Sequence, residues 1–173
     1  MQIKYSGIIV EPITLSEAKS WLKMDGITAD DTLITSLITQ IRELAEEVSG
    51  RALVVKTIEY FEDDYDEIKA GVLLPFPNHN EILEVKVNDV DTYYVKTGLS
   101  QFKLHLGVVT SSLSQGINLY VKYTTLAYCP AGLKLAMMKE IAQAYEKRGS
   151  TSENSQAALT SSFINYLSQF KVY

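Results

Sequence analysis

The sequence has very few of the residues that build metal sites and covalent cross-links. Its 173 residues include one cysteine, Cys129, and two histidines, His79 and His105. A single cysteine excludes an intramolecular disulfide and a site built on several thiolates, and it indicates a reducing compartment. Neither histidine has a partner at the i, i+4 spacing of helical metal sites, so we expect both to be structural or surface residues. The sequence therefore predicts no bound metal.

The sequence motifs that accompany catalysis and nucleotide binding are also missing. No GxGxxG, GxxxxGK[ST] or GxSxG pattern occurs, which removes the usual support for nucleotide-binding and hydrolase functions. Cys129 precedes Pro130 without a histidine nearby in the sequence, so we interpret it as a small buried side chain. The acidic run at 62–67 lacks the glycine and terminal glutamate of an EF-hand loop and reads as a solvated loop. We predict neither an enzyme activity nor a cofactor.

Long apolar runs and an excess of positive charge are absent as well. The opening stretch "MQIKYSGIIVEPITLSEAK" has a short apolar run with an early Glu11 and Pro12, so it resembles neither a signal peptide nor a membrane span. Acidic residues outnumber basic ones by 21 to 16, for a formal charge of −5. Because a surface of this charge repels phosphate, tight nucleic-acid binding through a broad basic face is not expected. We expect a soluble cytoplasmic product.

Two helices are predicted near the N-terminus. Thr14, with Glu17 three residues later, forms a capping box at the start of a helix over about 14–24. A second capping signal precedes a helix over 31–49, in which apolar residues recur at helical spacing and form a wide stripe. These signals predict an N-terminal helical pair.

The centre of the chain, about 52–123, is predicted to be an antiparallel β-meander. Beyond Arg51 the apolar period changes from about 3.6 to 2. Leu83, Val85 and Val87 alternate with polar residues, which predicts one buried and one wet face. Further β runs, separated by turn signals, lie around 72–74, 82–87, 92–95, 102–106 and 117–123.

Helical spacing returns in the last part of the chain. It predicts a helix over about 131–148, a mobile polar linker "STSENSQ" at 150–156, and an aromatic C-terminal segment at 157–173. The predicted fold class is therefore α+β: an N-terminal helical pair, a central antiparallel β-meander, and C-terminal helices packed on the helical side. We assign 1–149 to one domain.

The order of these segments resembles the head-tail connector (adaptor) family of tailed double-stranded DNA bacteriophages. The stretch "LSEAKSWL" is similar to the family's "LSLEEAKxHL". The acidic pair Asp30 and Asp31, at the start of helix 31–49, is similar to its "DD" helix start, and "AEEVSGR" is similar to its "AxExxTGR". Further on, "LPFPNHNEILEVKV" is similar to "LPxPPVxxVxSV", and "VKYTTLAYCPAGLKLAMMKEIAQAYEKRG" to "VxYxAGYxxVPxxLKxAILxLVAHxYExR". The match covers about 13–149, with "TLA" in place of "AGY" and "PNHN" in place of "PPV". The matching residues in the helical motifs are Leu15, Ser16, Glu17, Ala18, Lys19, Leu22, Asp30, Asp31, Ala45, Glu47, Gly50, Arg51, Pro130, Leu133, Lys134, Ala136, Tyr145, Glu146 and Arg148.

This resemblance implies a structural virion protein located in the neck and made in the cytoplasm of a bacterial host. It implies a homo-oligomeric ring of about twelve copies below the portal protein. The ring would extend the DNA channel and join the capsid to stopper or tail proteins. Genomic double-stranded DNA would pass through the lumen without sequence-specific binding, and no membrane would be involved.

The resemblance also implies which parts of the chain contact partners. The C-terminal segment 157–173 is expected to dock on the portal, although an ordinary last helix packed on its own domain is the open alternative. The expected docking anchors are Phe163, Tyr166, Leu167, Phe170 and Tyr173. The polar side of helix 31–49 is expected to meet the next protomer, and the residues expected at that interface or at the helix-to-strand junction are Arg42, Glu46 and Arg51.

Other functions stay open at this point. A different neck or tail-completion protein is one, although such proteins are mostly β-barrels and the helical pair argues against them. An enzyme or regulatory domain of unknown chemistry is another, which a deep pocket with several perturbed pKa values would support. A helix-turn-helix DNA-binding protein is a third, but the turn "KMDGITADD" is acidic where a recognition helix begins with basic or amide side chains.

Overall fold

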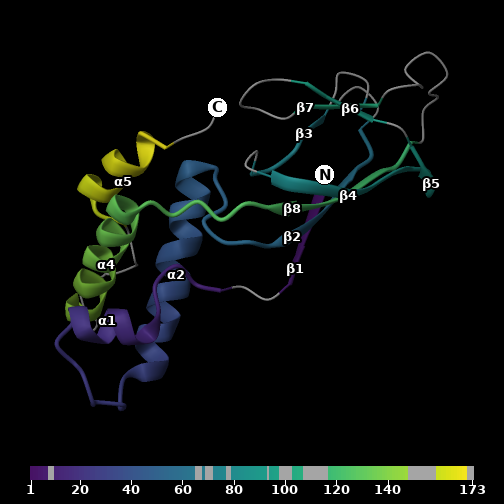
Figure 1. Cartoon of the computed structure of the whole chain (residues 1–173). Helices are drawn as coiled ribbons and strands as arrows, with labels where there is room; N and C mark the ends of the chain where they lie inside the picture. Colours follow the sequence, from purple (N-terminus) through teal and green to yellow (C-terminus); the bar gives the residue numbers. More distant parts are fainter. Residues whose placement is uncertain are drawn as a thin grey trace. The chain divides into compact units, whose positions relative to one another are not determined.

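A computed structural model of the chain describes residues 1–7, 10–64, 68, 72–76, 79–92, 94–97, 103–106, 117–147 and 159–170 (Figure 1). The expected linker at 150–156 and the expected anchor Tyr173 lie outside the described residues.

The structure is α+β, which confirms the predicted fold class. The helices are α1 (Leu15–Trp21), α2 (Asp31–Ser49), α4 (Ala131–Glu146) and α5 (Ser161–Ser168). The strands are β1 (Gln2–Ser6), β2 (Thr57–Glu62), β3 (Val72–Leu73), β4 (His79–Val87), β5 (Val90–Asp91), β6 (Tyr94–Thr97), β7 (Lys103–Leu106) and β8 (Leu119–Thr125).

The described chain forms two compact units whose segments interleave in the sequence. The β unit consists chiefly of Met1–Ile9 and Val54–Ala127, and the helical unit consists of Val10–Leu53 and Tyr128–Lys171. The predicted domain 1–149 includes segments of both units, because segments of the β unit and of the helical unit alternate along the sequence.

The helical unit forms where the local signals are strongest. At α1, Glu17 Oε2 accepts the backbone N–H of Thr14 (2.9 Å), and Thr14 Oγ1 accepts that of Glu17 (3.2 Å), so the capping box is present. At the C-terminal end of α2, Gly50 has φ 67° and its N–H donates to the carbonyl of Glu46 (2.9 Å). A residue with a side chain would be strained in this left-handed conformation, so Gly50 ends α2 cleanly.

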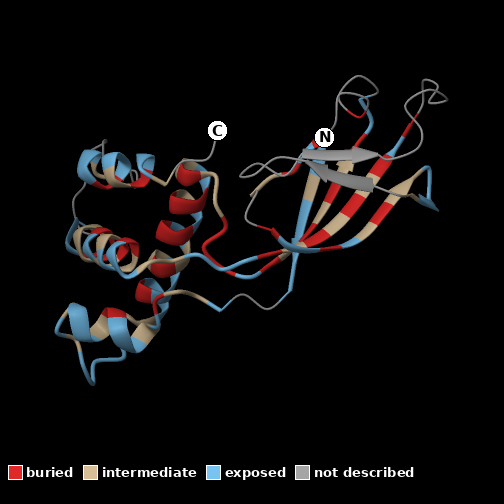
Figure 2. Cartoon of the chain, turned by 45° about the horizontal axis from the view of Figure 1, so that its top comes forward, coloured by how far each residue is buried: buried red, intermediate tan, exposed pale blue. Residues whose placement is uncertain are grey.

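The core of the helical unit is built from the apolar faces of α2, α4 and α5. Figure 2 shows buried residues running along α2. The central side chains are fully buried and aliphatic or aromatic, and they remove the apolar stripe of each helix from water. They are Ile34, Ile38, Ile41, Ala45, Leu133, Met137, Ile141, Phe163 and Leu167.

The β unit contains a five-stranded antiparallel sheet in the order β1-β2-β8-β4-β5 and a three-stranded sheet in the order β3-β7-β6. β8, the last strand in the sequence, lies in the middle of the larger sheet between β2 and β4. Along β2 and β8 buried residues alternate with less buried ones, as a sheet with one wet face requires (Figure 2). β1 has no counterpart among the strands predicted from the sequence.

One detail of the predicted alternation is wrong. Leu83 is 49% exposed, whereas Ile82 and Val85 are buried. The pairing of β4 with β8 shifts register between Ile82 and Glu84, so Leu83 is the extra residue of a β-bulge. A shift of one residue turns a side chain to the other face of the sheet, which is why strict alternation fails at this point.

Candidate assembly surfaces

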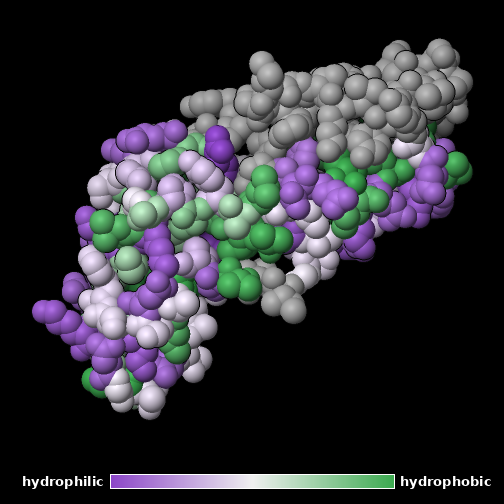
Figure 3. All heavy atoms as spheres, viewed as in Figure 1, coloured by the Kyte–Doolittle hydropathy of each residue, from purple (hydrophilic) through white to green (hydrophobic). Residues whose placement is uncertain are grey.

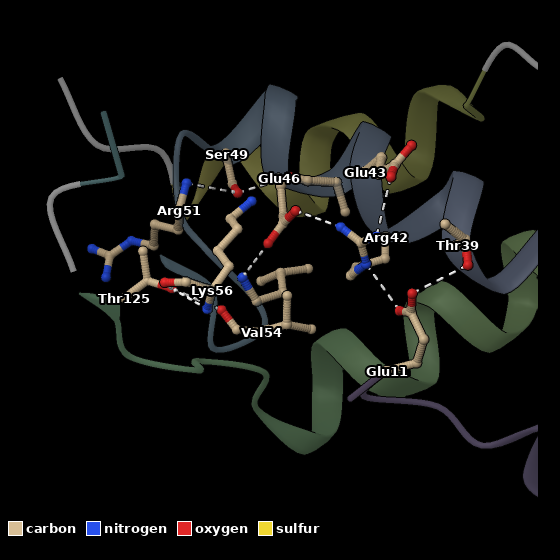
Figure 4. Close-up of polar contacts among 12 residues, drawn as sticks. Glu11, Thr39, Arg42, Glu43, Glu46, Ser49, Arg51, Val54, Lys56 and Thr125 are labelled. Carbon is tan, nitrogen blue, oxygen red and sulfur yellow. Dashed lines mark hydrogen bonds and ion pairs between the residues drawn. The ribbon is translucent and has the colours of Figure 1, made fainter. Parts of the chain in front are cut away.

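Arg42 is a buried arginine surrounded by three carboxylates (Figure 4). Its Nε donates to Glu11 Oε2 (2.9 Å), Nη1 to Glu46 Oε2 (2.7 Å) and Nη2 to Glu43 Oε1 (3.2 Å). The Arg42 side chain is only 3% exposed. Burial works against its charged form, but the hydrogen bonds and charges of Glu11 and Glu46 outweigh burial and raise the pKa of Arg42. The guanidinium is therefore charged and fixed in one orientation.

Glu46 connects this cluster to the chain that follows α2. Its Oε2 accepts from Arg42, and its Oε1 accepts the backbone N–H of Leu53 (2.8 Å). From the other side, Thr39 Oγ1 donates to Glu11 Oε1 (3.1 Å), so the segment before α1 is joined to the middle of α2. Within one chain, Arg42 and Glu46 thus organise the junction at the end of α2. Their contact with a neighbouring protomer stays a prediction.

Arg51 lies just beyond Gly50 and reaches the end of α5. Its Nε donates to the backbone carbonyl of Phe170 (2.8 Å), and its guanidinium lies over the ring of Tyr128, 5.5 Å from the centroid. Its own N–H donates to Ser49 Oγ (3.3 Å). A planar guanidinium suits this combination of a hydrogen bond with an aromatic face. Arg51 therefore fastens the helix-to-strand junction to the C-terminal part of the helical unit.

The predicted docking anchors occupy two environments. Phe163 and Leu167 are buried in the core of the helical unit, at 3% and 0% exposure. Tyr166 and Phe170 are half-buried, with ring centroids 5.3 Å apart. In the single chain α5 thus packs on its own unit, which is the alternative that the sequence left open. Docking on a portal stays a prediction.

α5 begins at a polar contact that the sequence analysis did not single out. Glu140 of α4 is buried, and its Oε2 accepts the backbone N–H of Thr160 (3.1 Å) while its Oε1 accepts the Thr160 hydroxyl. Thr160 Oγ1 in turn accepts the N–H of Phe163 (3.3 Å) and caps the helix. One signal was available in the sequence, because the acidic Glu140 directly precedes the core residue Ile141.

Gly132 of α4 and Tyr166 of α5 lie close together. A Cβ at Gly132 would overlap the Tyr166 hydroxyl, so glycine allows this close approach of the two helices.

A hollow of about 580 Å³ on the β unit is the best candidate for a small-molecule site. Its lining includes Phe61, Glu62, Glu84, Lys86 and Tyr120. Burial disfavours the charged Glu62, but hydrogen bonds, among them that from the Tyr60 hydroxyl, outweigh burial and lower its pKa. The hydrogen bond with Glu84 raises the pKa of Lys86, and burial raises that of Tyr120. Each shift strengthens the protonation state that the group already has near pH 7, which is the opposite of what acid–base catalysis needs.

Two of the remaining candidate residues, His79 and Cys129, have structural surroundings. His79 is buried, and its ring meets that of Tyr123 edge to face at 6.1 Å. Cys129 is half-buried, and burial raises the pKa of its thiol. His105 lies in β7. Within the described residues, no group of three or more His, Cys, Asp or Glu side chains could hold a metal ion. No helix in the described part of the chain is long and apolar enough to cross a membrane.

Comparison with known proteins finds structural relatives but no sequence relatives. No protein-family model matches the sequence, and no curated protein matches it significantly. Among solved structures, a chain of "Virion of native gene transfer agent (GTA) particle" is similar, with a TM-score of 0.73 and 14% identity over 100% of this chain and 96% of that chain. A chain of "Neck of empty GTA particle computed with C6 symmetry" has a TM-score of 0.72 and 13% identity over 100% and 97%.

A third similar chain belongs to "Neck of native GTA particle computed with C12 symmetry", with a TM-score of 0.59 and 12% identity over 96% of both chains. The likeness spans at least 96% of both chains in each pair, so it includes the helical unit as well as the β unit. This chain therefore shares the fold of chains found in the virion and neck of gene transfer agent particles.

Proposed function

We propose that this chain is a structural protein of the neck of a phage-like particle, an adaptor that forms a ring below the portal and joins the capsid to the tail. The observation that carries the proposal is the likeness of the complete fold to chains from the neck of a gene transfer agent particle, at 100% and 97% coverage. The ordered sequence motifs over about 13–149 that resemble the head-tail connector family support the same role independently of the fold.

The chemistry of the chain is compatible with a passive channel component. A protein with a formal charge of −5 holds phosphates weakly, so genomic DNA can slide through a lumen that such chains build. The shifted groups around the hollow on the β unit keep their ordinary protonation states at neutral pH, so they offer no general acid or base. Both points favour a structural function over an enzymatic one.

The body of the helical unit and the last segment of the chain have distinct parts in this proposal. The helical unit, fastened internally by Arg42, Glu46 and Arg51, acts as the rigid body that neighbouring copies contact. The last segment contacts the portal, with Tyr166 and Phe170 as the accessible anchors and the buried Phe163 and Leu167 holding α5 in shape. Stopper or tail proteins would bind the opposite end of the ring.

Inactivation of the gene in the phage or prophage that encodes the chain tests the proposal. We expect DNA-filled or leaking heads without tails together with free tails, and we expect the wild-type gene supplied in trans to restore tailed particles. Quantitative mass spectrometry of purified particles should find about as many copies of the chain as of the portal protein, as matched rings require. Normal tailed particles that lack the chain would overturn the proposal.

A further inference from the structure

The outer face of α2 is polar and ends in exposed acids. Its residues recur every three or four positions on the side of the helix opposite the buried Ile34, Ile38 and Ala45. This outer face consists of Ser36, Gln40, Glu43 and Glu47. Glu43 is 64% exposed although it also contacts Arg42. We call these four residues the α2 outer face.

The outer face of α4 has a different character. Its exposed residues lie opposite the buried Leu133, Met137 and Ile141. The face consists of Ala131, Leu135, Lys139 and Glu146. Leu135 is 39% exposed, and Lys139 lies one turn after it. We call these four residues the α4 outer face. It presents Lys139 beside an exposed leucine and a small residue, with Glu146 two turns after Lys139.

The two outer faces point in opposite directions, because α2 and α4 pack against each other through their buried sides. A closed head-to-tail ring needs two different surfaces on each copy, placed so that one copy's first surface meets its neighbour's second. Figure 3 shows that the helical unit mixes hydrophilic and hydrophobic residues in the view drawn, rather than presenting one broad apolar surface. The α2 outer face itself holds no apolar residue, so a contact there relies on charge and shape complementarity more than on apolar burial.

We infer that a second copy of this chain occupies these faces: the α2 outer face of one protomer meets the α4 outer face of the next, with Glu47 and Glu43 opposite Lys139. Among the described residues, neither Glu47 nor Lys139 forms an ion pair within its own chain. Leu135 then packs beside this pair against the uncharged part of the α2 outer face. The inference rests on the ring of the proposed function and adds to it the surfaces that close the ring.

Charge reversal tests the inference with the portal protein of the same phage as template. Glu47→Lys places lysine opposite Lys139, and Lys139→Glu places glutamate opposite Glu47, so each variant alone should lose the ring on the portal, measured as the mass of the complex. Lys23→Glu is the matched control, because Lys23 is exposed on the turn after α1, away from both faces. It should assemble like the wild type.

The mixture of the two reversed variants gives the most specific result. In a head-to-tail ring, Glu47→Lys copies that alternate with Lys139→Glu copies restore an opposite-charge pair at every contact. An even-numbered ring can be completed in this way, so a one-to-one mixture should recover the mass that each variant alone loses. The double variant Glu47→Lys/Lys139→Glu should also recover it.

A cross-linking experiment tests the same contact by proximity instead of by charge. Cys129 is the only cysteine, so a Cys129→Ser background carrying Glu47→Cys and Lys139→Cys offers one reactive pair per contact. A short bismaleimide should give a ladder of covalent multimers on the portal, and either cysteine alone should give none.

These outcomes separate the inference from the function on which it rests. If the wild type forms the ring and both single reversals form it equally well, or if the double-cysteine chain forms the ring but gives no ladder, the assigned faces are wrong while the adaptor function stands. If the wild type itself does not assemble on its portal, the proposed function fails and the inference fails with it. Each variant's far-ultraviolet circular dichroism should match the wild type, since both residues lie on exposed helix faces.

Discussion

Glu46→Ala is the substitution for which the structure makes the clearest energetic prediction. It removes a carboxylate that is buried at 3% exposure and that serves two partners at once. Arg42 loses its 2.7 Å ion pair, and the backbone N–H of Leu53 loses its 2.8 Å acceptor. Glu47, the next residue on the same helix, is exposed and provides the matched control.

The expected cost follows from these two losses. Removing one member of a buried ion pair typically costs about 3–5 kcal/mol, because the other charge stays buried. Arg42 keeps Glu11 and Glu43, which places the ionic part near the lower end of that range. The unsatisfied N–H of Leu53 adds about 1–3 kcal/mol where water cannot reach it. We therefore expect Glu46→Ala to lower the free energy of unfolding by about 4–6 kcal/mol, a large share of the stability of an ordinary domain.

Urea unfolding followed by circular dichroism at 222 nm measures this loss, because most of the helical signal comes from the helical unit. Glu46→Gln keeps an acceptor for the Leu53 N–H but loses the ion pair with Arg42, so it should cost about 3 kcal/mol. Glu47→Ala should change the free energy by less than about 0.5 kcal/mol. If Glu46→Ala matched Glu47→Ala, the carboxylate of Glu46 would have no organising role and our description of the junction would be wrong.

Three further changes test other parts of the structure. Arg51→Ala should lower the free energy of unfolding by about 1–2 kcal/mol, because the Phe170 carbonyl loses a charged donor. If the variant kept both the stability and the ring assembly of the wild type, Arg51 would have no role in either. Leu167→Ala should cost about 2–5 kcal/mol and speed protease cleavage near α5, whereas the exposed Ile164→Ala on the same helix should stay within about 0.5 kcal/mol of the wild type; equal effects would show that α5 is not packed as described. The hydrogen bond from a lysine of α4, followed by those from the capping threonine, lowers the pKa of Glu17 from 4.5 to about 2. The contribution of the ionised Glu17 carboxylate to the free energy of unfolding is therefore complete above about pH 4.5 and is lost as the pH falls toward 2. Urea midpoints measured across that range should fall less steeply in Glu17→Gln, and parallel curves would contradict this assignment.

Local signals explain how well the helices could be predicted. The helix over 31–49 agrees with α2 (Asp31–Ser49) because the acidic start, the apolar stripe and Gly50 all act within the same segment. The helix predicted over 14–24 is shorter, as α1 spans Leu15–Trp21, and its capping box is correct. In both cases the residues that decide where the helix begins and ends are neighbours in the sequence, whereas the stability of the helix comes mainly from packing on the rest of the unit.

The strands depended more on distant partners. β1 was missed because Gln2–Ser6 carries little alternation, with intermediate or exposed side chains throughout, and becomes a strand by pairing with β2 far along the chain. The bulge at Leu83 was equally invisible, since it arises from register with β8. Strand order was also not predictable, because chain order and spatial order differ once β8 lies between β2 and β4.

The candidate site shows the same limit. Arg42 was expected at an interface with the next protomer or at the helix-to-strand junction, with no distant partner, yet it is buried within its own chain because Glu11, 31 residues earlier, returns to cover it. Helical spacing did contain a hint, since Arg42 lies one turn after Ile38 and directly follows Ile41, both of which are core positions. Arg51 was recognised by its place after Gly50, but its partner Phe170 is 119 residues away.

The mass of the wild-type chain, measured alone and after mixing with the portal protein encoded by the same genome, tests the proposed function most directly. We predict that the portal gains about twelve copies of the chain, in agreement with one ring matched to a twelve-fold neck. A portal whose mass does not change in the presence of excess chain would contradict the assignment of this protein as a neck adaptor.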